Sequence, residues 1–341
     1  MYVNRLRLYG VKSLRRDIPS DGEFAEPAHR RLLLQGANGA GKTTILETIV
    51  SLWAFFGQWI ENGRGSRPPK YHTRHYLAKA ELAAVEFCDF ANGLPSLWVG
   101  MGNANSWQDL KREHGESQFA GLLNFGREKW SIELPDVDLA AVRAESIIGR
   151  VPQANVVYFP PENRTIAPLS LGSVRLLNMQ DFSWATIYGA DIDPDSLLLT
   201  IKATDPTQYK RCLELVNLAL AHRAKEILAV RGTERHAVQI RIDGKPPLSH
   251  LLDALSSGEK QLLLLVGFVV CVLRPGGIVL IDEPDLHMHI SLVTQLMETI
   301  ERIVHDRNGQ LIVASHSQLV WDWFVRDEER IDLTAWGQAK P

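Results

Sequence analysis

One segment constrains this chain more than any other. Residues 36–44 read GANGAGKTT and fit the pattern G-x-x-x-x-G-K-[ST] of a phosphate-binding loop. The apolar run at 32–34 predicts a buried strand before the loop, and ILETIV at 45–50 predicts a helix after it. Because the motif binds phosphate in this strand–loop–helix context, we predict a nucleotide site here.

The residue types in this loop suit phosphate binding. Glycines take backbone conformations that other residues avoid, so the N–H groups of the loop can point inward at phosphate oxygens. The N-terminus of the following helix adds positive potential. Lys42 would reach the β- and γ-phosphates, and the Thr43 hydroxyl would bind Mg²⁺. The predicted nucleotide-binding residues in the loop are Gly36, Ala37, Asn38, Gly39, Ala40, Gly41, Lys42, Thr43 and Thr44.

Length and composition limit the class of protein. The 341 residues allow one large domain or two modest ones, and a formal charge of −3 argues against a chain that binds polyanions over its whole surface. Three scattered cysteines without metal spacing, and charges near the N-terminus, favour a reduced cytoplasmic protein without a signal peptide. The longest apolar run, at 262–273, is too short to span a bilayer and predicts a buried helix, so we expect no membrane partner.

The remaining patterns predict a mixed α/β chain. Strands are expected at 1–9, 84–87, 97–100, 130–134, 155–159 and 237–242, with an antiparallel meander between 81 and 134. Residues 17–30 have the composition of a loop, 138–148 predict a helix, and helical patterns between 166 and 232 are clearest at 208–230.

A basic loop occupies residues 62–79. It contains five Lys or Arg residues and two histidines, and no acidic residue lies between Glu61 and Glu81. Such a loop can bind nucleic-acid phosphates or the acidic face of a partner. A solvated loop explains the same pattern equally well, and the sequence leaves both interpretations open.

A second motif lies just before the long apolar helix. Residues 255–261 read LSSGEKQ, so Ser256, Ser257 and Gly258 stand at a predicted helix start. Their hydroxyls and free N–H groups could bind an anion. Taken alone, the pattern is explained as well by an ordinary helix N-cap.

Two further buried strands end in polar residues. The run at 278–283 ends in Asp282 and Glu283, which point to different sides because successive strand side chains diverge. Asp282 would hold Mg²⁺, and Glu283 would polarise the attacking water. The strand at 310–315 leads into His316, which could donate to the γ-phosphate. The H-x-H spacing of His287 and His289 lacks a third ligand nearby, so we do not expect a metal there.

In this order, the four motifs resemble the ATP-binding-cassette (ABC) class of ATPases over roughly residues 1–60 and 236–320. Asn38 in the loop is similar to the chromosome-maintenance (SMC-like) and recombination-type ATPases. The stretch DEPDLHMH at 282–289 resembles the branch with the overcoming-lysogenization-defect (OLD) proteins and the ATPase subunits of bacterial anti-phage systems. Only 25 residues follow His316, so we expect no nuclease domain of the kind many OLD proteins carry.

The resemblance implies an α/β, ABC-ATPase-like P-loop fold with a central mixed or parallel sheet, an antiparallel β-subdomain and a helical lobe. The expected units are the N-terminal half of the ATPase core (1–60), the basic loop and β insertion (61–154), the helical lobe (155–235) and the C-terminal half of the core (236–341). Two departures from the family pattern are Ser257, where a glycine is common, and Pro161, where a glutamine usually contacts Mg²⁺ and water.

The family mechanism implies ATP and Mg²⁺ as ligands and a head-to-tail homodimer. Residues 256–258 of one subunit would contact the γ-phosphate bound at 36–44 of the other. The catalytic residues would be Glu283, Lys42 and His316, with slow, regulatory hydrolysis. One interpretation is a defence ATPase that controls a separate effector such as a nuclease. The alternatives are a recombination-type ATPase that clamps DNA directly and a binding-only protein with ATP as a structural ligand.

Overall fold

The computed structural model describes residues 1–18, 30–62, 76–91, 94–114, 119–123, 154–164, 184–189, 192–230, 235–242 and 245–333. The strand predicted at 130–134, the helix predicted at 138–148 and most of the basic loop at 62–79 lie outside these ranges. No helix in the described part of the chain combines the length and the apolar character needed to cross a membrane.

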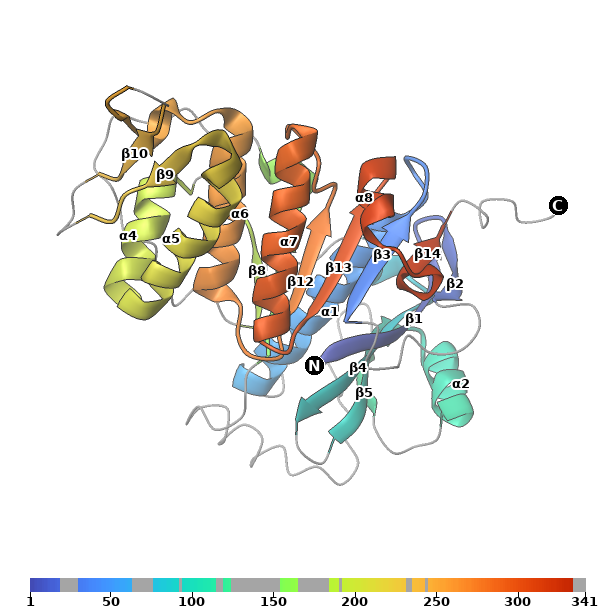
Figure 1. The fold of residues 1–341 in the computed structure, drawn as a ribbon. Coiled ribbons are helices and arrows are strands. Elements are labelled where there is room, and N and C mark those ends of the chain that lie inside the picture. The colour runs from blue at the N-terminus through green and yellow to red at the C-terminus, as the bar shows by residue number, and fades with distance from the viewer. Residues whose placement is uncertain are drawn as a thin grey trace.

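A six-stranded parallel sheet forms the centre of the molecule (Figure 1). All of its described pairs are parallel, which settles the expectation of a mixed or parallel sheet. The strands, in spatial order, are β14 (Arg330–Asp332), β3 (Arg31–Gln35), β13 (Gln310–Ser315), β12 (Ile278–Asp282), β7 (Val156–Phe159) and β8 (Ala185–Ile187). Because β13 lies between β3 and β12, the ends of these three strands are neighbours.

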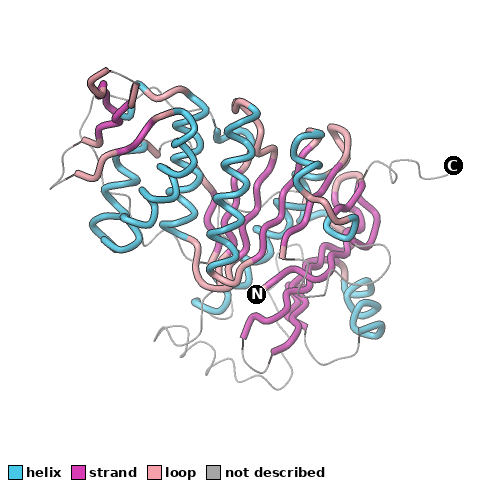
Figure 2. The backbone as a smooth tube through the Cα atoms, viewed as in Figure 1, coloured by secondary structure: helices cyan, strands magenta, loops and turns pink. Residues whose placement is uncertain are grey.

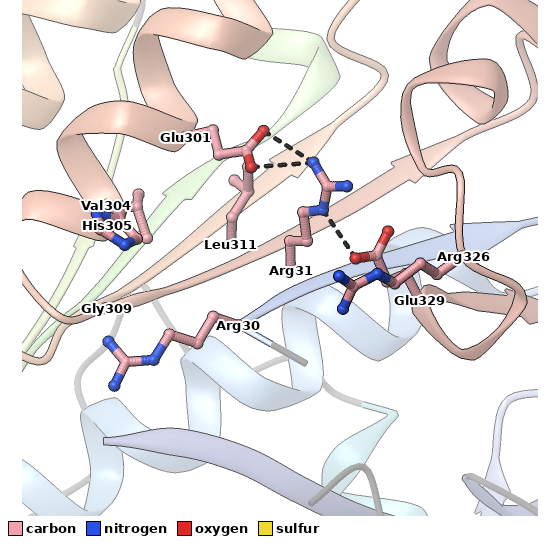
Figure 3. Close-up of a pocket in the computed structure, with 9 residues that line it drawn as sticks. All are labelled: Arg30, Arg31, Glu301, Val304, His305, Gly309, Leu311, Arg326 and Glu329. Carbon is pink, nitrogen blue, oxygen red and sulfur yellow. Dashed lines mark hydrogen bonds and ion pairs between the residues drawn. The ribbon is translucent and has the colours of Figure 1, made fainter. Parts of the chain in front are cut away.

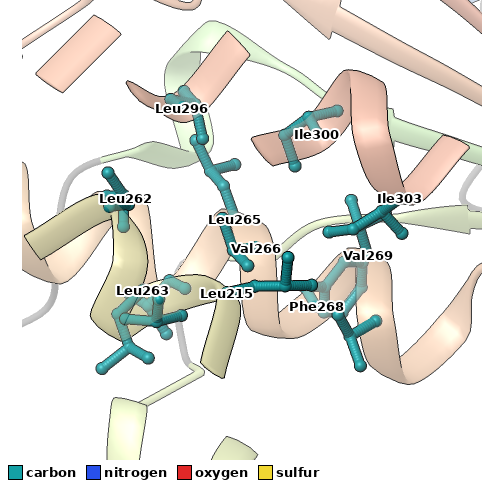
Figure 4. Packing of buried hydrophobic residues seen from close by; sticks show 14 of the residues in the cluster. Leu215, Leu262, Leu263, Leu265, Val266, Phe268, Val269, Leu296, Ile300 and Ile303 are labelled. Carbon is teal, nitrogen blue, oxygen red and sulfur yellow. The ribbon is translucent and has the colours of Figure 1, made fainter. Parts of the chain in front are cut away.

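The sheet is buried on both faces, which explains the continuous apolar runs in the sequence. Leu32 and Leu34 of β3 join one core, while Leu33 between them joins the other. Helix α1 (Lys42–Asn62) packs in the first core together with a second sheet. Helices α6 (Ser257–Val272) and α7 (Ile290–Asp306) cover the opposite face, and Figure 4 shows their interlocking side chains. This gives the layered arrangement seen in Figure 2.

The second sheet holds the N-terminus. Its order is β2 (Leu14–Ile18), β1 (Tyr2–Val11), β4 (Leu82–Ala91), β5 (Leu94–Gly102) and β6 (Phe119–Leu123). The antiparallel pairing expected between 81 and 134 is present for β4 and β5, but β5 and β6 pair in parallel. Strand β2 was not predicted: residues 17–30 were expected to form a loop, but Asp17 and Ile18 belong to β2, which pairs with β1 after a tight turn at Lys12 and Ser13. Residues 19–29 lie outside the described ranges. Helix α2 (Ala104–His114) follows β5.

Helices α4 (Pro194–Thr204) and α5 (Pro206–Leu220) pack beside α6 and continue into a small sheet of β9 (Lys225–Ile227), β10 (Ala237–Ile240) and β11 (Leu248–Leu251). We call residues 192–251 the lobe; this range differs from the helical lobe expected at 155–235, because β7 and β8 belong to the central sheet. The helical pattern predicted at 208–230 extends beyond the observed helix α5. Helix α5 ends at Leu220, and after a short 3₁₀ turn Ala224 takes a left-handed conformation (φ 55°) that turns the chain into β9.

The smaller elements complete the fold. Helix α8 (Gln318–Trp323) follows β13 and packs on α7. Short 3₁₀ turns occur at Leu77–Lys79, Pro161–Arg164, Ala221–Arg223, Leu252–Ala254 and Asp327–Glu329. Both helices of the lobe have capped N-termini. Asp193 and Asp205 each accept hydrogen bonds from backbone N–H groups of the first turn, and each is followed by a proline at the first helical position.

Candidate functional site

The loop between β3 and α1 has the conformation that its glycines allow. Gly39 (φ 84°) and Gly41 (φ 97°) take left-handed backbone angles. A Cβ on Gly41 would lie 2.7 Å from Leu14 Cδ2, so β2 packs directly against the loop. The strand at β3 and the helix at α1 flank this loop as the motif predicted.

Lys42 is folded into the loop and is only 5% exposed. Its Nζ donates to the carbonyl oxygens of Gly36 at 2.8 Å and Ala37 at 3.2 Å. The same atom lies 3.7 Å from Glu283 Oε1. The lysine ammonium therefore lies between the loop carbonyls and Glu283, the residue that follows β12.

Glu283 follows β12 in an unusual conformation. Its backbone is left-handed (φ 53°), which is uncommon for a residue with a side chain and is typical of functional sites. The backbone is fixed by a 2.7 Å hydrogen bond from Glu283 N to Ala314 O on β13. This turn directs the carboxylate across the end of β13 rather than away from the sheet.

The end of β13 supplies the partners of that carboxylate. His316 Nδ1 lies 2.8 Å from Glu283 Oε2, and the His316 backbone N–H donates to the same oxygen at 3.3 Å. The buried Ser315 hydroxyl is 3.4 Å from Glu283 Oε2 and from Asp285 Oδ1. Because a carboxylate only accepts, Nδ1 of His316 is the donor. Lys42, Glu283 and His316, which are far apart in the sequence, are thus brought together.

Thr43 and Asp282 were predicted to hold Mg²⁺. Thr43 lies in the first turn of α1, and Asp282 ends β12 with 1% of its surface exposed. A hydroxyl and a carboxylate are hard oxygen donors, and Mg²⁺ in nucleotide sites takes one or two protein ligands together with substrate phosphates. The donor set present therefore fits this ion.

Residues 256–258 lie apart from the loop of their own chain. Helix α6 runs antiparallel to the strand that follows it, so its N-terminus lies at the same sheet edge as the loop, on the far side of α7 (Figure 1). Ser256 caps α6: its Oγ accepts from Glu259 N, and Glu259 Oε2 accepts from Ser256 N at 2.9 Å. The N-cap interpretation is therefore correct for Ser256. Ser256 and Ser257 nonetheless remain exposed, so the cap does not bury them.

His289 has a structural partner of its own. It is the N-cap of α7, and its Nδ1 accepts from Ser291 N at 3.3 Å. Among the described residues, no group of three or more His, Cys, Asp and Glu side chains is placed to hold a metal ion.

A pocket of about 410 Å³ lies elsewhere, at the opposite edge of the sheet where β3 and β13 begin (Figure 3). Arg31 spans it, with NH1 2.9 Å from Glu301 and Nε 3.0 Å from Glu329. Its other lining residues are Arg30, Val304, His305, Gly309, Leu311 and Arg326. Since the glycine-rich loop follows the other end of β3, this pocket is separate from the predicted nucleotide site.

Sequence reasoning missed four residues of these networks. The Ser315 hydroxyl lies within hydrogen-bond distance of Glu283 and Asp285. Ser315 directly precedes His316, and Asp285 follows two residues after Glu283, so their closeness to these motif residues could have marked them. Lys225 and Arg223 contact Glu259 from the lobe. No local pattern marks these two, because the contact joins residues more than thirty positions apart.

Part of the chain is similar to known proteins. Residues 214–322 match the family described as "AAA domain, putative AbiEii toxin, Type IV TA system", a segment of about a third of the chain that contains residues 256–258, Asp282, Glu283 and His316. Protein ea59 of Escherichia phage lambda is 35% identical over 66 residues, which are 19% of this chain and 13% of that protein. The match thus spans only a small part of that protein's length.

Solved structures that the comparison found include an SMC head domain from Thermotoga maritima (18% identity, 94% of this chain and 92% of that chain, TM-score 0.43). The ATP-binding cassette MJ0796, a dimer bound to ADP and Pi, is 12% identical over 93% of this chain and 88% of that chain, with a TM-score of 0.35. We instead infer the class of this fold from the parallel sheet, the loop between β3 and α1, and the family match. Together they support a P-loop nucleotide-binding fold, with similarity to an AAA domain over residues 214–322.

Proposed function

We propose that the chain binds and slowly hydrolyses ATP. The observation that carries this proposal is the meeting of Lys42, Glu283 and His316 at one sheet edge, with distances of 3.7 Å and 2.8 Å to the two oxygens of Glu283. Backbone N–H groups of residues 36–44 would hold the phosphates, and Lys42 would exchange its carbonyl partners for phosphate oxygens. Thr43 and Asp282 would hold Mg²⁺, which neutralises phosphate charge when bound.

The residues also suit the chemical step. Water attacks the γ-phosphorus, the bond to the β–γ bridging oxygen breaks, and ADP leaves. Glu283 accepts the proton of the water, and the hydrogen bonds from His316 and Ser315 hold its carboxylate in place. His316, whose side chain is half exposed, would contact the γ-phosphate. Pro161 takes the place of the usual glutamine, which agrees with slow turnover.

We propose further that ATP closes a head-to-tail homodimer. Ser256 and Ser257 are exposed at a helix N-terminus, as donors to a phosphate on a second subunit must be. Each γ-phosphate would then be bound from both sides, and hydrolysis would release the pair. Glu283→Gln should accumulate dimers with ATP and Mg²⁺ in light scattering. A variant that stays monomeric at saturating ATP contradicts this model.

The dimer would control a separate effector, such as a nuclease, in bacterial defence against phage. The matched family description names a toxin of a type IV TA system, and the 66-residue relative comes from a phage. In plaque assays with the neighbouring genes present, protection should be lost with Lys42→Met and altered with Glu283→Gln. Equal protection by both variants and the wild type would exclude a role for the ATP cycle.

Direct DNA clamping is the rival hypothesis. Its support is the basic loop at 62–79, which lies mostly outside the described residues. Neutralising this loop should leave DNA affinity and its dependence on salt unchanged if the chain acts through an effector.

A further inference from the structure

A buried glutamate lies within the serine–glycine motif, and two cations of the lobe reach it. Glu259 is 0% exposed, and Lys225 Nζ on β9 lies 2.9 Å and 2.8 Å from its two carboxylate oxygens. Arg223 NH1 lies 3.6 Å from Glu259 Oε1. Hydrogen bonds from Lys225 and Ser256 outweigh the effect of burial and hold the pKa of Glu259 below its ordinary value.

Arg223 also reaches the segment that follows Asp282 and Glu283. Arg223 NH2 lies 3.3 Å from Ser291 Oγ, which in turn is 3.0 Å from His289 Nδ1. Gly258 packs beside this segment so closely that an added Cβ would lie 3.1 Å from Leu292 Cδ1. One connected set of contacts therefore joins the lobe, the start of α6 and the start of α7.

Charge explains why two cations are needed here. Glu259 lies one residue after Gly258, and an unbalanced carboxylate at that place would repel the γ-phosphate that residues 256–258 are proposed to bind. Lys225 and Arg223 together carry a charge of +2 and Glu259 carries −1, so the three side chains have a net positive charge. The hydrogen bonds between Glu259 and Ser256 also fix the turn at 256–258, in which the two serines are exposed and Gly258 is buried.

We propose that Lys225 and Arg223 are positioning residues, which hold the 256–258 turn ready for the phosphate of a second subunit and connect that turn to the lobe. This inference rests on the proposed ATP-dependent dimer. A partner that shifts β9 would change the strength of the dimer without touching the bound nucleotide.

The test measures the ATP concentration for half-maximal dimerisation of Glu283→Gln by light scattering. Adding Lys225→Met should raise it by about tenfold or more, because a buried carboxylate loses its closest partner. Adding Lys225→Arg should raise it less than Lys225→Met does, since a positive charge remains beside the buried carboxylate. ATP binding to the monomer should stay unchanged, because Lys42 and the loop lie on another part of the chain.

The matched control is Arg241→Met, which removes the exposed pair with Glu226 in the same small sheet and should have no effect on dimerisation. If Glu283→Gln with added Lys225→Met dimerises at the same ATP concentration as Glu283→Gln alone, the positioning role is overturned. Failure of Glu283→Gln itself to dimerise would overturn both the proposed dimer and this inference, so the two failures are distinct.

A second variant addresses the case in which Lys225→Met fails to fold. Glu259→Gln keeps the capping box while removing the buried charge, so combined with Lys225→Met it should fold. Where Lys225→Met folds, the combined variant should dimerise at several-fold lower ATP concentration than Lys225→Met, because the repulsive carboxylate is gone. Where Lys225→Met does not fold, the combined variant should still dimerise at an ATP concentration within about tenfold of that needed by Glu283→Gln alone. A combined variant that folds, binds ATP and remains monomeric would contradict the electrostatic argument.

Discussion

His316 Nδ1 and Glu283 Oε2 lie 2.8 Å apart, across the ends of two neighbouring parallel strands. The contact depends on the left-handed turn at Glu283, which follows β12, and on the position of β13 beside it. The other oxygen of the same carboxylate faces Lys42. One side chain thereby connects the phosphate loop with the end of β13.

Glu283→Gln should abolish turnover while sparing ATP binding. Glutamine keeps an oxygen acceptor for His316 but cannot take a proton from water, so phosphate release should fall by about 10²–10⁴-fold. Steady-state phosphate release and titration of a fluorescent ATP analogue measure the two quantities. Asp322→Asn, an exposed change on α8, is the control. Retention of more than a tenth of the wild-type rate would remove Glu283 from the catalytic role.

His316→Ala should lower kcat more than it raises KM. The imidazole holds the Glu283 carboxylate, and the backbone N–H of residue 316 keeps a weaker contact after truncation. We expect a loss of about tenfold to a hundredfold in kcat, with the ATP affinity nearly unchanged. His305→Ala, an exposed histidine at the opposite sheet edge, serves as the comparison. An effect on KM alone, with kcat unchanged, would contradict the role of His316 in holding Glu283 for the chemical step.

Lys42→Met should remove the stabilisation that ATP provides. Wild-type protein with ATP at a hundred times its Kd should gain about 2.7 kcal/mol of unfolding free energy, and the variant should gain almost none. Thermal unfolding with and without ATP–Mg²⁺ gives the comparison. Because Lys42 Nζ also bonds to the loop carbonyls, the unliganded variant is expected to be slightly less stable. An equal thermal shift in both proteins would disprove nucleotide binding through this lysine.

The sequence was a reliable guide where the signal is local. The loop flanked by a strand and a helix, the capped start of α6 and the two apolar strands before Asp282 and His316 all follow from short patterns. The expected α/β fold is confirmed. The structure brings Lys42, Glu283 and His316 together, and their chemical roles stay predictions.

Features that depend on distant contacts were beyond such patterns. Strands β8 and β14 have three residues each, too few for a periodic signal, and are defined only by pairing with β7 and β3. The end of α5 depends on the left-handed Ala224 and on the pairing of β9 with β10, which overrode a helical pattern. The ion pair of Lys225 with Glu259 likewise exists only in the folded chain.

Acid should reveal the ion pairs of Glu259. The pKa of Glu259 is lower in the folded protein than in the unfolded chain, so its ionised form stabilises the fold above the ordinary glutamate pKa of about 4.3. That stabilisation is lost as the pH falls through the lowered pKa, when Lys225 and Arg223 lose their partner. Glu259→Gln should therefore lose less thermal stability than wild type between neutral and acid pH. Parallel curves for the two proteins would show that the pair contributes no pH dependence.

Gly57→Ala should destabilise the protein, although alanine is the better helix former. In an open helix this change would be worth up to about 1 kcal/mol of extra stability. Here the added Cβ would lie 1.9 Å from Cγ of the buried Trp184, so the ring must move within a close-packed core. Trp184 also contacts Trp53 and Phe56, which leaves it little freedom. We expect a loss of about 1–3 kcal/mol in urea unfolding. Gly267→Ala on α6 is the control, because its nearest neighbour is the flexible end of Leu197 at 2.9 Å, and it should cost less. A higher urea midpoint for Gly57→Ala would contradict the packing of α1 against Trp184.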